Sequence, residues 1–134
     1  MNRTHLASAI RTLASGLGYT VVEESDDRAP QTITAFPSAW LLPLRLKTIE
    51  GRHHGRQTYS VELRVIYSAM KLSADKRAEL HSRAEENLLE LFIQLSGDDR
   101  VIAVQNLSIQ PGTGGYTQHG ELSQIAKADV ITYF

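Results

Sequence analysis

The chain begins with an apolar pattern of helical period. Four apolar residues recur three or four positions apart, so they share one face of an amphipathic helix. Thr4 is available as the N-cap of this helix, and Gly16 or Gly18 can end it. The residues that share the face are Leu6, Ile10, Leu13 and Leu17.

Alternating apolar and polar residues mark two strands on either side of a polar turn. The turn runs from Gly51 to Arg56, so the pattern predicts an antiparallel hairpin. If Glu50 pairs with Gln57, large apolar residues oppose one another across the hairpin. The same register places Arg45 opposite Glu62. The apolar series are Trp40, Leu42, Leu44 and Leu46 in the first strand, and Tyr59, Val61, Leu63, Val65 and Tyr67 in the second.

Shorter β-favouring runs precede the hairpin. Tyr19 to Val22 can form a short strand, and Thr32 to Phe36 is predicted as a strand that ends at Pro37. The acidic segment between them is predicted as a loop. Within the hairpin, Pro43 favours an edge position or a bulge, because proline cannot donate to a ladder.

A longer helix and two strands follow. The helix is predicted to begin at the N-cap Ser73 and to end at Gly97. From Leu88 to Ile93 its apolar band widens, so it either lies centrally on the sheet or also forms a subunit contact. The last two strands are predicted at Val101 to Gln110, with a bulge around Gln105 and Asn106, and at Ile125 to Phe134.

These elements predict an α+β fold that forms a single domain over residues 1–134. We expect a mainly antiparallel sheet with both helices packed on one face. The predicted order is helix, three strands, helix and two strands. A chain of 134 residues can bury such a core without disulfides or a structural metal.

Composition removes several classes of function. The absence of cysteine excludes a disulfide framework, a thiolate nucleophile and a Cys-ligated zinc. The formal charge of −1 argues against a broadly basic nucleic-acid binder, so we do not expect nucleic acid as a specific ligand. The apolar runs are only a few residues long, so we expect neither a signal peptide nor a membrane span.

The turn of the hairpin gathers the basic side chains of Arg52, His53, His54 and Arg56. Such a tip can contact nucleic acid or an acidic neighbouring protein, and a solvated turn is the simpler interpretation. Adjacent histidines point to opposite sides of an extended chain, and no third ligand stands nearby at metal-binding spacing. We therefore expect no metal site.

No other cluster indicates catalysis. The glycines between Gly112 and Gly115 are not followed by the Gly-Lys-Ser/Thr of a phosphate-binding loop. No Gly-x-Ser-x-Gly motif is present to activate a serine. An enzyme would need polar residues gathered only by folding, such as His81, Glu85 and Asp129. We expect no catalytic residue and no cofactor, and hence a protein that is not an enzyme.

This order of elements, from the helix around Leu6 to the strand ending at Phe134, resembles the tail-terminator family of long-tailed bacteriophages and prophages. These are also called tail completion or minor tail proteins. The resemblance implies a structural protein of virion assembly with no catalytic residues. It implies a homo-oligomeric ring, usually a hexamer, that caps the tail tube, stops its polymerisation and joins it to the head.

The same resemblance implies partners and a location. The partners are further copies of the chain, the tail tube protein and the head–tail connector proteins. The location is the virion tail, and the host cytoplasm during assembly. In such a ring we expect the hairpin tip and the loop from Pro111 to Glu121 to contact neighbouring subunits or the tube, with tolerated surface loops as an equal alternative. The candidate contact residues are Arg52, His53, His54, Arg56, Thr113, Tyr116 and His119.

A second hypothesis comes from another class of protein. The chain would then be a small cytoplasmic binding or regulatory module that holds a peptide or ligand in a groove between helix and sheet. A monomer with one deep pocket would favour this module, whereas self-association into rings would favour the tail protein.

Overall fold

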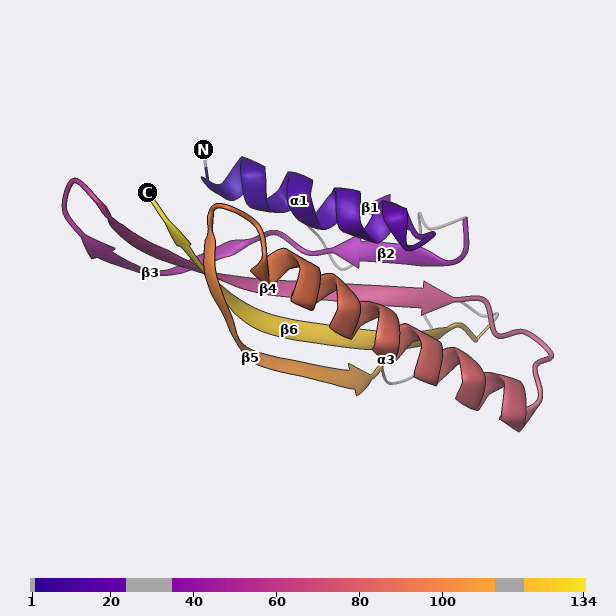
Figure 1. Ribbon diagram of the computed structural model, residues 1–134. Helices are drawn as coiled ribbons and strands as arrows, with labels where there is room; N and C mark the ends of the chain where they lie inside the picture. Colours follow the sequence, from indigo (N-terminus) through magenta and orange to yellow (C-terminus); the bar gives the residue numbers. More distant parts are fainter. Residues whose placement is uncertain (1, 24–34, 113–119) are drawn as a thin grey trace.

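One mainly antiparallel sheet forms the body of the protein, and two helices cover one of its faces (Figure 1). The computed structural model describes residues 2–23, 35–112 and 120–134. The predicted α+β class and the predicted order of helices and strands are confirmed. The elements are α1 (Asn2–Gly16), β1 (Thr20–Val22), β2 (Ser38–Leu41), β3 (Arg45–Gly51), β4 (Gly55–Tyr67), α3 (Ala74–Ser96), β5 (Val101–Pro111) and β6 (Leu122–Tyr133).

The long strand β4 lies at the centre of the sheet. The strand order is β1-β2-β4-β6-β5, and β3 pairs with β4 as well. β2 pairs with the end of β4 and β3 with its beginning, so both lie along the same edge of that strand. The residues 42–44 separate β2 from β3, which divides the single strand predicted before the turn. Pro43 lies in this break, in agreement with its predicted irregular position.

The core lies between the helices and the sheet face that they cover. Each helix contributes its apolar stripe, and alternate residues of the two longest strands fill the space beneath. The buried residues are Leu6, Ile10 and Ala14 of α1, Ala84, Leu88, Leu91, Phe92 and Leu95 of α3, Tyr59, Val61, Leu63, Val65 and Tyr67 of β4, and Ala126, Ala128 and Val130 of β6.

A buried polar contact fastens α3 to the sheet. The side-chain amide of Asn87 donates to the hydroxyl oxygen of Tyr19 at 2.9 Å, and this hydroxyl also bonds that of Tyr67. Burial, followed by the hydrogen bond with Tyr67, raises the pKa of Tyr19 far above its usual value. The Tyr19 hydroxyl therefore stays protonated, so it can accept from Asn87 and still share a proton with the hydroxyl of Tyr67.

The helix ends agree with the sequence at three of four positions. Ser73 is the N-cap of α3, because its hydroxyl accepts from the Lys76 N–H at 3.3 Å, and Gly97 is the C-cap. α1 ends at Gly16, as predicted. The prediction of Thr4 as its N-cap is wrong, because α1 already begins at Asn2.

The predicted register of the hairpin is wrong. Glu50 pairs with Arg56 rather than Gln57, and a further shift between Leu46 and Thr48 places Arg45 opposite Ser60 rather than Glu62. The first shift arises in the turn, because Gly51 pairs with Gly55. The irregularity around Lys47 and the break between β2 and β3 then change the pairing further. The apolar series before the turn is consequently split between the two faces. Leu44 joins the main core, whereas Trp40 packs with Ile66 in a separate cluster.

Two further strand predictions have different outcomes. The bulge predicted in the strand after α3 is present, since the pairing of β5 with β6 shifts between Gln105 and Ser108 and Asn106 has a φ of 56°. The strand predicted at Thr32 to Phe36 lies partly outside the described residues. Its last two residues form a bend, and β2 begins at Ser38.

The centre of the sheet makes a direct test of this packing. Leu63 of β4 is fully buried, so Leu63→Ala should lower the free energy of unfolding by about 2–5 kcal/mol. The matched control is Ile49→Ala on β3, where the side chain is 58% exposed and the change should stay within about 0.5 kcal/mol. Urea unfolding followed by Trp40 fluorescence measures both. Equal losses in the two variants would contradict the described core.

Candidate functional site

A hairpin arm projects from one end of the sheet. We call residues 45–56 the arm; they comprise β3, the turn and the start of β4. All seven residues of β3 are exposed, and Figure 1 shows β3 and its turn extending away from the helices. An exposed hairpin of this length contributes little to the core, which makes it a candidate for contact with another molecule.

The arm carries an apolar face that the helices do not cover. Leu46 pairs with Tyr59 and Ile49 pairs with Gln57, and directly paired residues point to the same side of a sheet. Tyr59 belongs to the helix-covered face, so Leu46 and Ile49 continue that face beyond the body. They are 40% and 58% exposed. An apolar sheet face normally packs against a further element, and here that element is missing from the described part of the chain.

The end of β6 broadens this surface. Phe134 exchanges two backbone hydrogen bonds with Gly55, at 3.0 and 3.3 Å, so a third chain segment lies beside the arm. Phe134 is 40% exposed, and by its pairing with Gly55 it lies on the same side as Ile49. We call Leu46, Ile49 and Phe134 the arm face.

The tip of the arm is basic, as the sequence indicated. Arg52, His53, His54 and Arg56 are all exposed; the first three form the turn, and Arg56 lies at the start of β4. Glu50 is the only acidic residue in the arm. The other three candidates, Thr113, Tyr116 and His119, lie outside the described residues.

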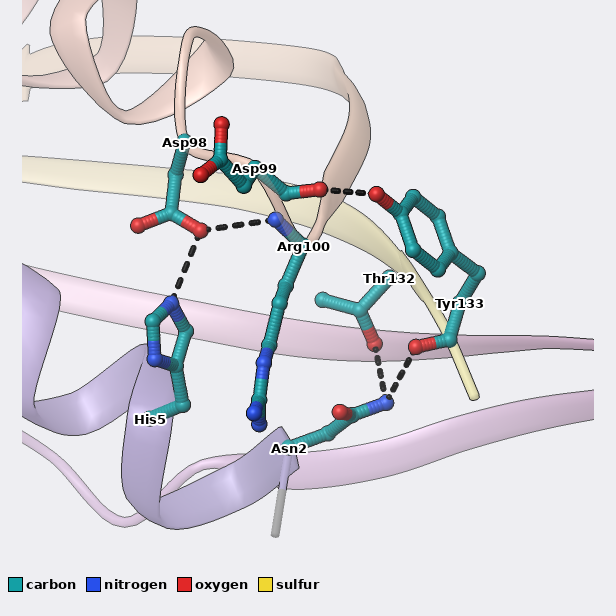
Figure 2. A network of polar contacts seen from close by, with 7 residues as sticks. All are labelled: Asn2, His5, Asp98, Asp99, Arg100, Thr132 and Tyr133. Atoms are coloured by element: carbon teal, nitrogen blue, oxygen red, sulfur yellow. Dashed lines mark hydrogen bonds and ion pairs between the residues drawn. The ribbon is translucent and has the colours of Figure 1, made fainter.

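A polar network holds the root of the arm (Figure 2). The Asn2 side-chain amide at the start of α1 donates to the Thr132 hydroxyl at 3.2 Å and to the Tyr133 carbonyl at 2.9 Å. The Tyr133 hydroxyl donates to the Asp99 carbonyl in the turn after α3. The first turn of α1, the turn after α3 and the end of β6 are thereby tied together, which sets the direction in which the arm leaves the body.

A hydrogen bond between His5 and Asp98 strengthens the same root. Nε2 of His5 lies 2.8 Å from Oδ1 of Asp98, and the Arg100 backbone N–H donates to the same oxygen at 2.9 Å (Figure 2). Although burial acts in the opposite direction, these two contacts hold the pKa of Asp98 below its usual value of 3.8. The carboxylate is thus stabilised in its charged form.

A second exposed apolar site lies on α3. Leu89 and Ile93 stand one helical turn apart and are 46% and 56% exposed. The widened band of α3 is therefore divided, because its other apolar residues face the core. Glu85, Glu86 and Glu90 are exposed around this pair, so its rim is acidic. We call Leu89 and Ile93 the helix patch.

The residues that could have formed a catalytic cluster do not meet. His81 bonds Gln124 through Nδ1 at 2.8 Å, whereas Asp129 bonds Lys47 and Asn106, each at 2.9 Å. Lys127 and Asp129 alternate with the buried residues of β6, so Asp129 points away from the helices. Within the ranges that the structure describes, no three metal-binding side chains gather at one place.

Two hollows line α1. One has a volume of about 280 Å³ and lies between α1 and the segment that joins β2 to β3, with Arg3 and Leu44 in its wall. The other has about 330 Å³ and lies between α1 and the end of α3, next to His5 and Asp98. Both volumes are at the lower end of the range of small-molecule sites, so they give the binding-module hypothesis little support.

Comparisons with known proteins add no relative. The chain matches no model of a known protein family, and no curated protein matches it. Of the helices in the described residues, neither has the length and hydrophobicity needed to cross a membrane.

Sequence reasoning predicted the basic tip but missed the apolar face of the arm. It placed Leu46 in the core opposite Val61, and it left the role of the band around Leu89 open. The lengths of the strands and helices could have indicated that part of the sheet face is left uncovered. A strand of 13 residues such as β4 spans about 44 Å, whereas a helix of 15 residues such as α1 spans about 22 Å, so α1 alone cannot cover that strand.

The polar contacts at the root of the arm should make the free energy of unfolding decrease at acidic pH. The pKa of Asp98 is lower in the folded state than its unfolded value of 3.8. The carboxylate therefore stabilises the folded state fully at a pH above 3.8, and this contribution is lost as the pH falls through the pKa of the folded state. Asp98→Asn should therefore lower the free energy of unfolding by about 1 kcal/mol at pH 7. Urea unfolding from pH 7 to about pH 2 should show the gap to wild type closing in acid. A gap of constant size would contradict the role given to Asp98.

Proposed function

We propose that the chain is a structural protein of bacteriophage or prophage tails, of the tail-terminator kind. In this role it forms a ring of identical subunits that caps the tail tube and joins it to the head. The order of its elements, which resembles that family, suggested the role. The arm is the observation that carries it, because the arm supplies a surface built for contact.

The arm suits assembly for a physical reason. Exposing Leu46 and Ile49 on a projecting hairpin leaves apolar area in water, which is unfavourable for a chain that remains alone. The basic tip adds long-range attraction toward an acidic partner. A ring subunit can use both features, since each copy must recognise the next one with a surface that lies outside its own core.

The polar clusters of the body serve the fold. His5 pairs with Asp98 at the root of the arm, and His81 bonds Gln124 between α3 and β6. Each of these histidines has a structural partner, so neither stands as a free general base. This arrangement fits a protein that acts by binding other molecules through its surface.

The test replaces the basic tip. The four changes Arg52→Ser, His53→Ser, His54→Ser and Arg56→Ser should weaken self-association about tenfold or more and leave the free energy of unfolding within about 0.5 kcal/mol of wild type. The control carries Lys71→Ser and Lys76→Ser, two exposed cations beyond the opposite end of β4. Sedimentation velocity over a range of concentrations gives the association, and urea unfolding gives the stability. A tip variant that assembles like wild type would contradict the proposal.

A further inference from the structure

The arm face and the helix patch are two halves of one contact. We propose that the arm of one copy packs its apolar face against the outward side of α3 of the next copy. This inference rests on the proposed function, because it names the partner surface of the arm within the ring.

The apolar parts match in kind. In the body, the sheet face that contains Tyr59 is covered by helices, and the arm face continues it without a cover. A helix with outward apolar residues is the element that such a face accepts. α3 offers Leu89 and Ile93, one turn apart, as the anchors of that contact. The helix α3 of the neighbouring copy would therefore cover the arm face, as the two helices of each copy cover the rest of its own sheet.

The charged parts match in sign. The tip of the arm carries Arg52, His53 and His54. The other cations of the arm lie on the opposite side from the arm face, since Arg45 pairs with Ser60 and Arg56 with Glu50, and Lys47 bonds Asp129. The second half of α3, from Glu85 to Ser96, has three glutamates and no lysine or arginine. Glu86 and Glu90 are exposed beside the helix patch, so a basic arm lying over Leu89 and Ile93 would place opposite charges at the rim.

The positions of the two surfaces determine the symmetry. The arm leaves one end of the sheet, whereas α3 packs along β5, β6 and α1 (Figure 1). In the proposed ring, the arm and the helix patch of one copy meet two different neighbours, which makes the contact head-to-tail. Such contacts continue until they close into a ring.

Charge reversal tests the pairing. Variant A carries Arg52→Glu and His53→Glu in the turn of the arm, and variant B carries Glu86→Lys and Glu90→Lys. Each variant alone should associate about tenfold or more weakly than wild type, because like charges then meet at the contact. A 1:1 mixture should recover association to within about threefold, because the acidic arm of A meets the basic helix of B, and the basic arm of B meets the acidic helix of A. Lys71→Glu with Lys76→Glu is the matched control and should leave association unchanged.

Cross-linking tests the contact itself, and the chain has no cysteine to interfere. A mixture of Ile49→Cys and Ile93→Cys chains should form a mixed disulfide dimer under mild oxidation. The control replaces Ile93→Cys by Ala78→Cys, an exposed site of the same helix about 22 Å away, and should form far less of that product.

The outcomes separate this contact from the proposed function. If wild type associates and variant A weakens it while variant B does not, the arm has another partner surface and the inference is overturned, although the ring proposal stands. Failure of the 1:1 mixture to recover association, or equal cross-linking at both helix sites, also overturns the inference. A wild-type chain that stays monomeric at every concentration contradicts the ring proposal as well.

Discussion

The structure depends on one constraint: an apolar sheet face must be covered, and the two helices cover only part of it. Over the body, α1 and α3 bury the helix-covered side of β4 and β6 almost completely. Beyond the helices the sheet continues as the arm, where the same side remains in water with Leu46 and Ile49 exposed. The protein thus combines a stable core with an extension that gains stability when something packs against it.

The arm can persist uncovered because its backbone and its root are held. The outer strand pairs with β4, and the last residues of the chain pair with the start of β4 on its other side, so the base of the arm has three strands. Asn2 and the His5–Asp98 pair tie that base to both helices. A partner would consequently meet a surface of fixed direction, which limits the entropy lost on association.

Local signals predicted much of the fold. The limits of α3 followed from Ser73 and Gly97, because a cap is a property of a few neighbouring residues. In β6, apolar residues alternate with Lys127 and Asp129, and the structure buries the apolar side. The hairpin register was not predicted, because the alternation of apolar residues shows neither the residue at which the turn closes nor the extra residue at Lys47. The error placed Leu46 in the core, and for that reason the sequence indicated the charges of the arm but not its apolar face.

The central claim is that the protein assembles head-to-tail through two different surfaces. The most direct measurement is the mass and symmetry of the wild-type assembly, by native mass spectrometry and class averages of negatively stained particles. Head-to-tail assembly should give a closed ring of more than two subunits, with each arm reaching the next subunit. A monomer, or a dimer in which both copies use the same surface, would contradict it.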